Sequence, residues 1–355
     1  MRISHSASRS FTSAVLLALA LGACSKDQGP SEFNPDGMSA DITAAQNAFS
    51  SPASQSFSAT GSAMAQVLGA SAPAVVSPVS ALKNPASARY YAQSVVRLLP
   101  KAGGISAAVA EIPSNLLGTT FVWDLATGAY VASDQTGAPA TGVRFMLYAL
   151  NPVTLEPADP LSEMGYVDIT DVGAGATVGR RVLAVAGGVT YLDYTATGTG
   201  TQSSGTLAIQ GFATNGTNRV NFSLGTTVAQ SPSGMVLTLD FSLSFPVRGL
   251  TITYTATFAN LTPEEVAVTL DYTVSGRNGS ARVSGTYGAD GGSFSVRVNG
   301  ELFATVSIGA GGEDPVITSA TGTELTLAEQ AVMHLIMAFY DGSLSVFDGL
   351  LEPVM

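Results

Sequence analysis

The chain offers few side chains for nucleophilic or transition-metal catalysis. It contains two histidines, His5 and His334, and one cysteine, Cys24. A Ser-His-Asp triad would have to use His334, which lies between Met333 and Leu335 in a stretch with helical spacing, a position typical of a packed helix. Because zinc sites use several His or Cys ligands, the sequence predicts neither a catalytic residue nor a zinc site.

Carboxylates are the remaining candidates for chemistry. Glu264 and Glu265 are adjacent and follow Pro263 in a turn between strands, where neighbouring side chains point to opposite faces and form no acid/base pair. Asp168 and Asp171 in the run YVDITD could supply oxygen ligands to calcium, but their spacing is not that of an EF-hand loop. The sequence therefore predicts no metal site, and Asp168 and Asp171 are the residues to examine for calcium.

Two aromatic residues could contact a sugar. Trp123 and Tyr130 flank Asp124–Gly128, which predicts a hairpin near the start of a sheet. Aromatic residues on strands more often belong to the core, and we expect that role here. No ligand-binding residue is identified from the sequence.

The charge balance argues against two classes of partner. Arg2 and Arg9 precede residue 24, so the rest of the chain has 26 acidic against 13 basic residues, a net charge of −13. Nucleic acids and anionic lipid headgroups are bound by clustered Lys and Arg, which this chain lacks. With 46% hydrophobic and only 12% charged residues, the composition favours an exported, β-rich chain.

The N-terminus has the pattern of an export signal. Arg2 and Arg9 lie in a segment without acidic residues, and residues 14–21 form an apolar run of eight. A bilayer requires about 20 helical residues, so this run is too short to span one. A basic start followed by a short apolar run is typical of a secretory signal peptide.

An aliphatic residue, two small residues and a cysteine follow the apolar run. They are Leu21, Gly22, Ala23 and Cys24. This pattern resembles the lipobox of bacterial lipoproteins, and the resemblance covers residues 1–25. It implies cleavage before Cys24, diacylglycerol on its thiol, and an acyl chain such as palmitate on the new amine. A lone cysteine forms no internal disulfide, which agrees with lipidation.

The resemblance implies a location in the cell envelope. Several acyl chains, each contributing about 0.8 kcal/mol per buried CH₂, hold a protein stably on a membrane. In this family an Asp after the cysteine retains the protein at the inner membrane, so Ser25 favours the outer membrane. Whether the chain faces the periplasm or the cell surface stays open, and no cofactor other than the covalent lipid is expected.

Composition and periodicity divide the chain into four parts. We expect a signal peptide at 1–23, a lipidated, flexible tether at 24–37, a helical or irregular part at 38–118, and a β domain at 119–355. Helical spacing occurs between Met38 and Phe49, around Met64 to Leu68, and over 86–99. A capping box at Thr326–Glu329 begins a further helix, to about residue 340.

The β domain shows a period of two. Residues 235–245, 250–258 and 266–274 alternate apolar and polar side chains, with threonine frequent on the polar side. Short turn sequences such as Asn299-Gly300 separate about twelve such runs and predict antiparallel pairing. Residues 143–150 are apolar on both faces, which predicts a central or helix-covered strand. We expect a mainly β (α+β) fold, a large curved antiparallel meander such as a half-barrel, packed against N-terminal and C-terminal helices.

These features favour a lipid-anchored envelope protein that is not an enzyme. It would bind a protein partner, or a lipid or other apolar ligand, through the curved sheet. One alternative is an outer-membrane β-barrel or a surface adhesin. Another is a carboxylate-dependent glycoside hydrolase, which needs two facing acids about 5–9 Å apart.

Overall fold

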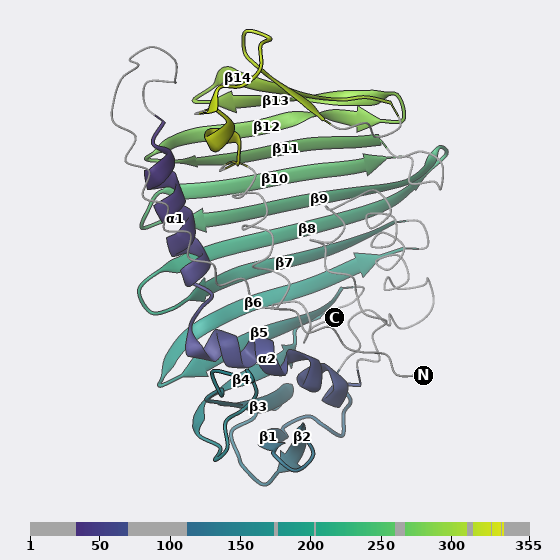
Figure 1. The fold of residues 1–355 in the computed structure, drawn as a ribbon. Helices are drawn as coiled ribbons and strands as arrows, with labels where there is room; N and C mark the ends of the chain where they lie inside the picture. The colour runs from purple at the N-terminus through teal and green to yellow at the C-terminus, as the bar shows by residue number, and fades with distance from the viewer. Residues whose placement is uncertain are drawn as a thin grey trace, which may run out of the picture.

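We describe the protein from a computed structural model, shown in Figure 1. The structure describes residues 33–69, 112–173, 177–201, 204–259, 267–310, 315–327, 329–334 and 336. Within these residues the main element is one sheet of fifteen strands, in the order β15-β14-β13-β12-β11-β10-β9-β8-β7-β6-β5-β4-β3-β1-β2. The sheet is open, with β15 and β2 as its edges.

Two helices precede the strands along the chain, α1 at Pro35–Asn47 and α2 at Pro52–Val67. The longest strands lie in the middle of the sheet. The strands are β1 Thr120–Asp124, β2 Ala129–Ser133, β3 Gly142–Tyr148, β4 Glu163–Asp171, β5 Val178–Ala186, β6 Val189–Gly200, β7 Ser204–Thr214, β8 Arg219–Ser231, β9 Gly234–Phe245, β10 Leu250–Ala259, β11 Ala267–Gly276, β12 Gly279–Gly288, β13 Gly291–Val298, β14 Glu301–Ile308 and β15 Val316–Ser319.

The predicted antiparallel meander is confirmed. Every neighbouring pair from β3 to β15 is antiparallel, while β1 pairs with β3 in parallel. Between β13 and β14, Asn299 and Gly300 both have positive φ, as a two-residue hairpin turn requires. The predicted number of about twelve strands is too low, because strands of four or five residues such as β1, β2 and β15 are too short to show a clear alternation.

Both described N-terminal helices begin before the residues at which helical spacing appears in the sequence, each after a capping side chain. The side chains of Asn34 and Ser51 accept hydrogen bonds from backbone amides of the first turns, at 2.9 and 3.0 Å. Pro35 and Pro52 follow these caps, where a missing N–H costs nothing. Helix α1 starts inside the segment 24–37 that the sequence assigns to a tether.

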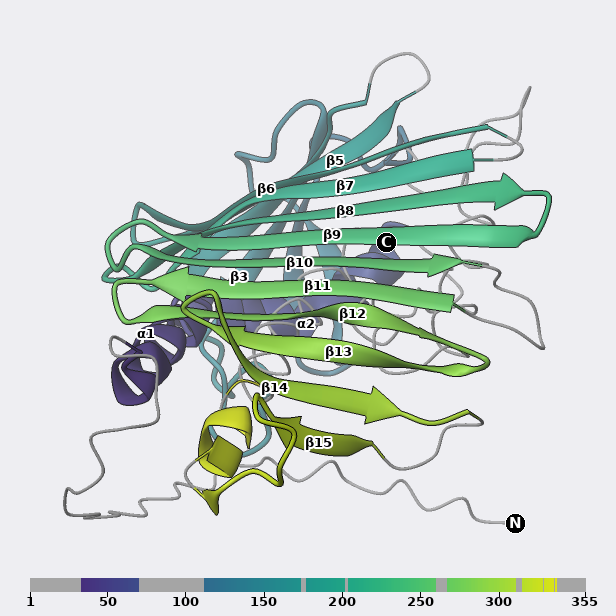
Figure 2. The ribbon, with the colours of Figure 1, turned by 90° about the horizontal axis from the view of Figure 1, so that it is seen from above.

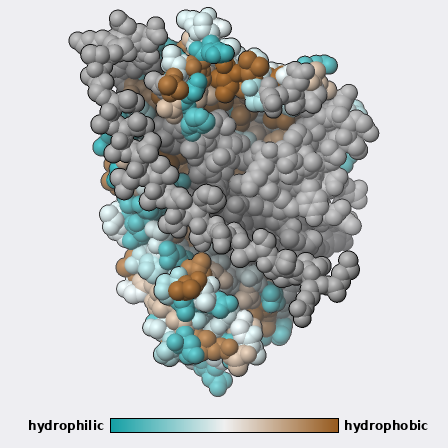
Figure 3. All heavy atoms as spheres, viewed as in Figure 1, coloured by the Kyte–Doolittle hydropathy of each residue, from teal (hydrophilic) through white to brown (hydrophobic). Residues whose placement is uncertain are grey.

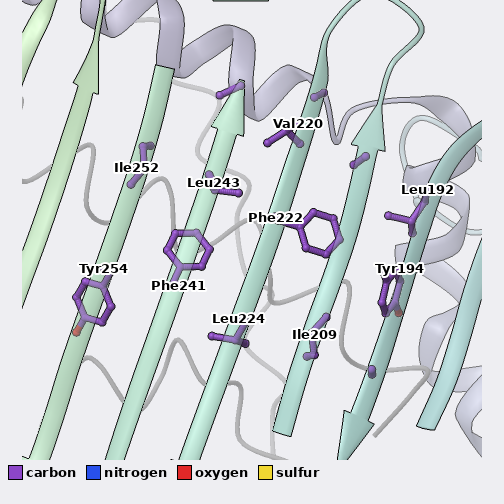
Figure 4. Close-up of a cluster of buried hydrophobic side chains, with 14 of the residues drawn as sticks. Leu192, Tyr194, Ile209, Val220, Phe222, Leu224, Phe241, Leu243, Ile252 and Tyr254 are labelled. Atoms are coloured by element: carbon purple, nitrogen blue, oxygen red, sulfur yellow. The ribbon is translucent and has the colours of Figure 1, made fainter. Parts of the chain in front are cut away.

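The strands separate a buried face from a solvent-facing one, here called the inner and the outer face. The inner residues of β9 beyond Met235 are all apolar and at most 5% exposed: Leu237, Leu239, Phe241, Leu243 and Phe245. Inner residues of β6 to β10 form one continuous apolar layer, part of which is shown in Figure 4. The period of two in the sequence therefore arises because alternate side chains of each strand point into the core and toward solvent.

The helices pack on the inner face. Phe57 and Met64 of α2 are fully buried, and α2 contacts strands β2 to β6. The ring of Phe49, just after α1, lies 6.1 Å from that of Phe222 on β8. Figure 2 shows that the sheet is curved and that α1 and α2 lie inside the curve. Helix α2 covers the inner face of β3, as predicted for residues 143–150, but the outer face of β3 is not apolar, because Arg144 pairs there with Asp168.

A buried carboxylate joins α1 to the turns at one end of the sheet. Asp41 accepts a hydrogen bond from Nη1 of Arg248 at 2.9 Å and another from Nδ2 of Asn278 at 2.7 Å. Arg248 lies in the turn between β9 and β10, and Asn278 in the turn between β11 and β12. We call this contact the Asp41 clamp.

The outer face carries hydroxyl groups in register across nine strands. Pairing places one hydroxyl residue of each strand from β6 to β14 opposite the next; they are Thr199, Thr206, Thr227, Thr238, Thr257, Thr269, Thr286, Ser293 and Ser307. Neighbouring strands are about 4.8 Å apart, so the row is evenly spaced. One row of uncharged polar side chains thus crosses the outer face from β6 to β14, beside charged pairs such as Arg282 and Asp271.

The C-terminal helix begins with the predicted capping box. The amide of Thr326 donates to Oε2 of Glu329 at 2.7 Å, and the amide of Glu329 donates to Oγ1 of Thr326 at 3.4 Å. Met333 and Ile336 are buried. No helix among the described residues is long and apolar enough to cross a membrane.

Several predicted features lie outside the described residues. They are the signal peptide and lipobox at 1–24, the helix at 86–99, Glu264, Glu265 and the end of the C-terminal helix. In the described part, exposed hydrophobic residues gather on the edge strands β14 and β15, at Leu302, Val316 and Ile317. Hydrophobic atoms are visible at that end of the molecule in Figure 3.

Candidate functional site

The two aspartates considered for calcium lie on opposite faces of the sheet. Asp168 is on the outer face, where Arg144 donates to both of its oxygens at 2.7 and 2.8 Å. Asp171 is on the inner face and accepts a hydrogen bond from the amide of Ile112 at 2.8 Å. Among the described residues no group of three or more His, Cys, Asp or Glu side chains could hold a metal. The structure therefore does not bring Asp168 and Asp171 together.

Asp171 also lies beside a buried cation. Arg180 on β5 is 2% exposed, with Nε 3.9 Å from Oδ1 of Asp171. Burial lowers the pKa of Arg180, and the negative charge of Asp171 opposes that shift. Asp171 thus partly balances the charge of an inward-pointing arginine.

The aromatic pair of the first hairpin belongs to the core. Trp123 and Tyr130 pack edge to face with centroids 5.2 Å apart, and Tyr130 is 5% exposed. The hydroxyl of Tyr130 donates to the carbonyl of Met146 at 2.8 Å. Burial raises the pKa of Tyr130 well above its usual range. His334 is exposed on the C-terminal helix, away from the buried Met333 and Ile336.

A polar hollow of about 610 Å³ lies on the outer face across β5 to β9, and we call it the outer depression. Its volume is in the range of sites that hold small ligands. Outward side chains of five neighbouring strands line it; they are Arg181, Asp193, Thr195, Gln210, Phe212, Arg219, Asn221, Ser223, Ser242 and Ser244. Amides, hydroxyls, one carboxylate and two guanidinium groups thus surround one aromatic ring.

One wall of the outer depression is a fixed ion pair. Arg181 donates to both oxygens of Asp193 at 2.9 and 2.8 Å. These hydrogen bonds, together with the charge of Asp193, raise the pKa of Arg181. Arg181 is 47% exposed, so the pair adds little to stability but fixes the direction of both groups.

Beside this ion pair a guanidinium is stacked on an aromatic ring, since Phe212 is the cross-strand partner of Asp193. The guanidinium carbon of Arg219 lies 3.6 Å from the centroid of Phe212. Its Nε donates to Oδ1 of Asn221 at 3.2 Å. Stacking and hydrogen bonding hold the guanidinium plane in place with its Nη groups free of described partners.

The inner packing beneath the outer depression depends on a glycine. Gly211 pairs with Tyr194 on one side and Phe222 on the other. A Cβ at Gly211 would lie 2.2 Å from the carbonyl oxygen of Asp193 and 2.4 Å from Cβ of Tyr194. The missing side chain therefore makes room for Tyr194, whose pKa burial raises well above its usual range.

Sequence reasoning did not find the outer depression. Its residues are spread over residues 181–244, and none belongs to a short motif. The available signal is an arginine and a phenylalanine on the polar side of alternating strands. The lining residues come together only through the pairing register of four successive strand pairs, from β5–β6 to β8–β9.

A smaller hollow of about 330 Å³ lies at the β14–β15 end. Glu301, Glu324 and Glu329 are among its lining residues. Oε2 of Glu329 accepts hydrogen bonds from Thr326 and so caps the C-terminal helix. This hollow has no feature beyond its carboxylates that indicates a ligand.

Comparison with known proteins gave no relative. No protein-family model, no curated protein and no solved structure matches the chain.

Proposed function

We propose that the chain is a lipid-anchored, non-enzymatic protein of the bacterial cell envelope that binds a glycan through the outer face of its sheet. The lipobox pattern at Leu21–Cys24 supports the anchor, and Ser25 after the cysteine favours the outer membrane as its location. The outer depression is the observation that supports binding. The adhesin interpretation of the sequence is the one that this surface favours.

The chemistry of the outer depression matches a hydroxyl-rich ligand. Each Ser hydroxyl both donates and accepts hydrogen bonds, and the amides of Gln210 and Asn221 do the same through separate atoms. Together they can pair with the hydroxyl groups of a sugar from either direction. The hydroxyl groups of Thr206, Thr227 and Thr238 extend the same chemistry along β7 to β9.

The inner face supports an apolar ligand less well. Tyr194, Phe241 and Tyr254 are at most 5% exposed and belong to the core cluster. Side chains already packed in a core would have to separate to admit an acyl chain, at a cost in packing energy. We therefore place binding on the outer face.

The outer depression also supports binding rather than hydrolysis. Asp193 is the one carboxylate among its lining residues, and both of its oxygens accept hydrogen bonds from Arg181. Glycoside hydrolysis requires two carboxyl groups that face each other across the bond to be cleaved.

Blocking the outer depression tests this proposal. In a Cys24→Ala background, Ser223→Cys places the single thiol of the chain in the outer depression, and Ser307→Cys places it on the same face at β14 as a control. Both positions are exposed. Each thiol is coupled to polyethylene glycol, and binding to immobilised dextran, galactan and polygalacturonate is measured.

We expect the polymer at residue 223 to abolish binding to at least one polysaccharide and the polymer at residue 307 to leave it intact. Absence of binding to every polysaccharide before coupling would refute the proposed function. Equal binding by both coupled proteins would do so as well.

A further inference from the structure

The outer depression carries a positive charge in an acidic protein. The chain has a net charge of −11, whereas two arginines and one aspartate line the outer depression. Asp193 balances Arg181 through two hydrogen bonds. Arg219 has no carboxylate within salt-bridge distance among the described residues. One cationic group therefore remains for a ligand.

Three other arginines of the outer face have a carboxylate partner, whereas Arg219 and Arg297 have none among the described residues; Arg297 donates instead to the backbone carbonyl of Gly300 at 3.1 Å. Arg144 pairs with Asp168, Arg181 with Asp193, and Arg282 with Asp271. The partners of Arg219 are the ring of Phe212 and the amide oxygen of Asn221, both uncharged. Arg144, Arg181 and Arg282 each form an ion pair that links two neighbouring strands. Arg219 forms no such ion pair among the described residues.

The geometry of Arg219 suits a carboxylate. Its Nε is used by Asn221 and its plane lies on Phe212, so the two Nη groups are the donors that remain. A guanidinium held in one plane binds a planar carboxylate more favourably than a mobile one, because less side-chain freedom is lost on binding. The ligand is thus expected to present a carboxylate at the β8 side of the outer depression.

The remaining lining groups indicate what carries that carboxylate. Gln210, Ser223, Ser242 and Ser244 are uncharged and suited to hydroxyl groups. The lining offers one outward aromatic ring and no aliphatic wall, which disfavours a fatty acid. A bare inorganic anion would leave most of the 610 Å³ to water.

We infer that the outer depression binds an acidic sugar, a hexuronate unit of a polysaccharide, with its carboxylate on Arg219 and its hydroxyl groups on the amides and serines of β7 to β9. This inference rests on the proposed function and specifies its ligand. Negative charge elsewhere on the protein would repel an acidic polymer, so the cation in the outer depression would favour binding there.

The test compares an acidic sugar with its neutral counterpart. Isothermal titration calorimetry of the full chain is carried out with a galacturonate tetrasaccharide and with the galactose tetrasaccharide obtained by reducing its carboxyl groups. Two variants are measured, Arg219→Gln and, as a matched control on the same face, Arg282→Gln. Circular dichroism verifies that both variants are folded, which we expect because both side chains are exposed.

We expect the acidic tetrasaccharide to bind at least about tenfold more tightly than the neutral one, the factor that one charge-assisted hydrogen bond provides. Arg219→Gln should remove this preference, while Arg282→Gln should keep it. The preference should also weaken as salt is raised.

Other outcomes separate this inference from the proposed function. Equal binding of both tetrasaccharides, blocked by a polymer at residue 223, would refute the acidic ligand and leave glycan binding in place. Competition by acetate or inorganic phosphate as strong as by the tetrasaccharide would show an anion site without sugar recognition and would overturn the inference. Binding of neither sugar, here and on the polysaccharide panel, would refute both.

Discussion

The Asp41 clamp gives the sharpest test of how the helices are held on the sheet. Replacing Asp41 with Ala removes the acceptor of two hydrogen bonds, one from Arg248 and one from Asn278. No other described contact joins α1 to these two turns through a charged group. The variant should therefore loosen α1 from the sheet without changing the strands.

The expected loss follows from burial and charge. Hydrogen bonds to charged groups contribute about 1.5–3 kcal/mol each when they are shielded from water. The side chain of Asp41 is 10% exposed, but that of Arg248 is 41% exposed, so water screens the ion pair and its share is reduced. We expect Asp41→Ala to lower the free energy of unfolding by about 2 kcal/mol, mostly through the loss at Asn278.

Urea unfolding followed by circular dichroism measures this loss. Gln46→Ala, an exposed change on the same helix, is the control and should stay within about 0.5 kcal/mol of the wild type. A double-mutant cycle with Arg248→Ala should give a coupling of about 0.5 kcal/mol or more between the two charged residues. A loss for Asp41→Ala no larger than for Gln46→Ala, with no coupling, would show that α1 is held by apolar packing alone.

Three further predictions test other parts of the account. Cys24→Ala should move the protein from the membrane fraction to the soluble fraction and abolish the acyl mass on the N-terminal peptide in mass spectrometry; an unchanged distribution would refute the anchor. Gly211→Ala should lower the free energy of unfolding, measured in urea, by about 1–3 kcal/mol because the new Cβ would collide with the backbone of β6. The control Gly225→Ala, whose Cβ would lie 3.8 Å from Asp240, should cause no such loss. Equal losses in the two variants would contradict the close packing at Gly211. Tyr130 and Tyr194 should keep their protons when exposed tyrosines ionise. Because the unfolded chain releases these protons near pH 10 and the folded chain does not, stability should fall as pH rises above 10. Ionisation of all eleven tyrosines near pH 10 with an intact circular dichroism spectrum would contradict this.

The sequence predicts most of the described fold because alternation in strands and spacing in helices depend on local contacts. The run Leu237 to Phe245 alternates so regularly that the order of its residues alone identifies its inner face. The helical spacing from Met38 to Phe49 likewise indicates α1, although the helix begins earlier, at Pro35. The short strands at the sheet edges carry too few residues for such a pattern, so the sequence predicts fewer strands than the sheet contains.

The candidate site was not predictable from the sequence because it depends on register. Phe212 and Asn221 become neighbours through the pairing of β7 with β8, and Asp193 joins them through β6. A shift of one residue in either pairing would turn these side chains to the inner face. Asp168 and Asp171 show the converse: they are close in sequence, but strand geometry places them on opposite faces.

Photo-crosslinking tests most directly whether the outer face is the binding surface. A diazirine-bearing galacturonate oligosaccharide is bound to the full chain and irradiated, and the modified residues are identified by peptide mass spectrometry. We predict modification at Gln210, Asn221, Ser223 and Ser242, competed by unlabelled oligosaccharide. Modification confined to α1, α2 or the inner residues of the strands would contradict binding on the outer face.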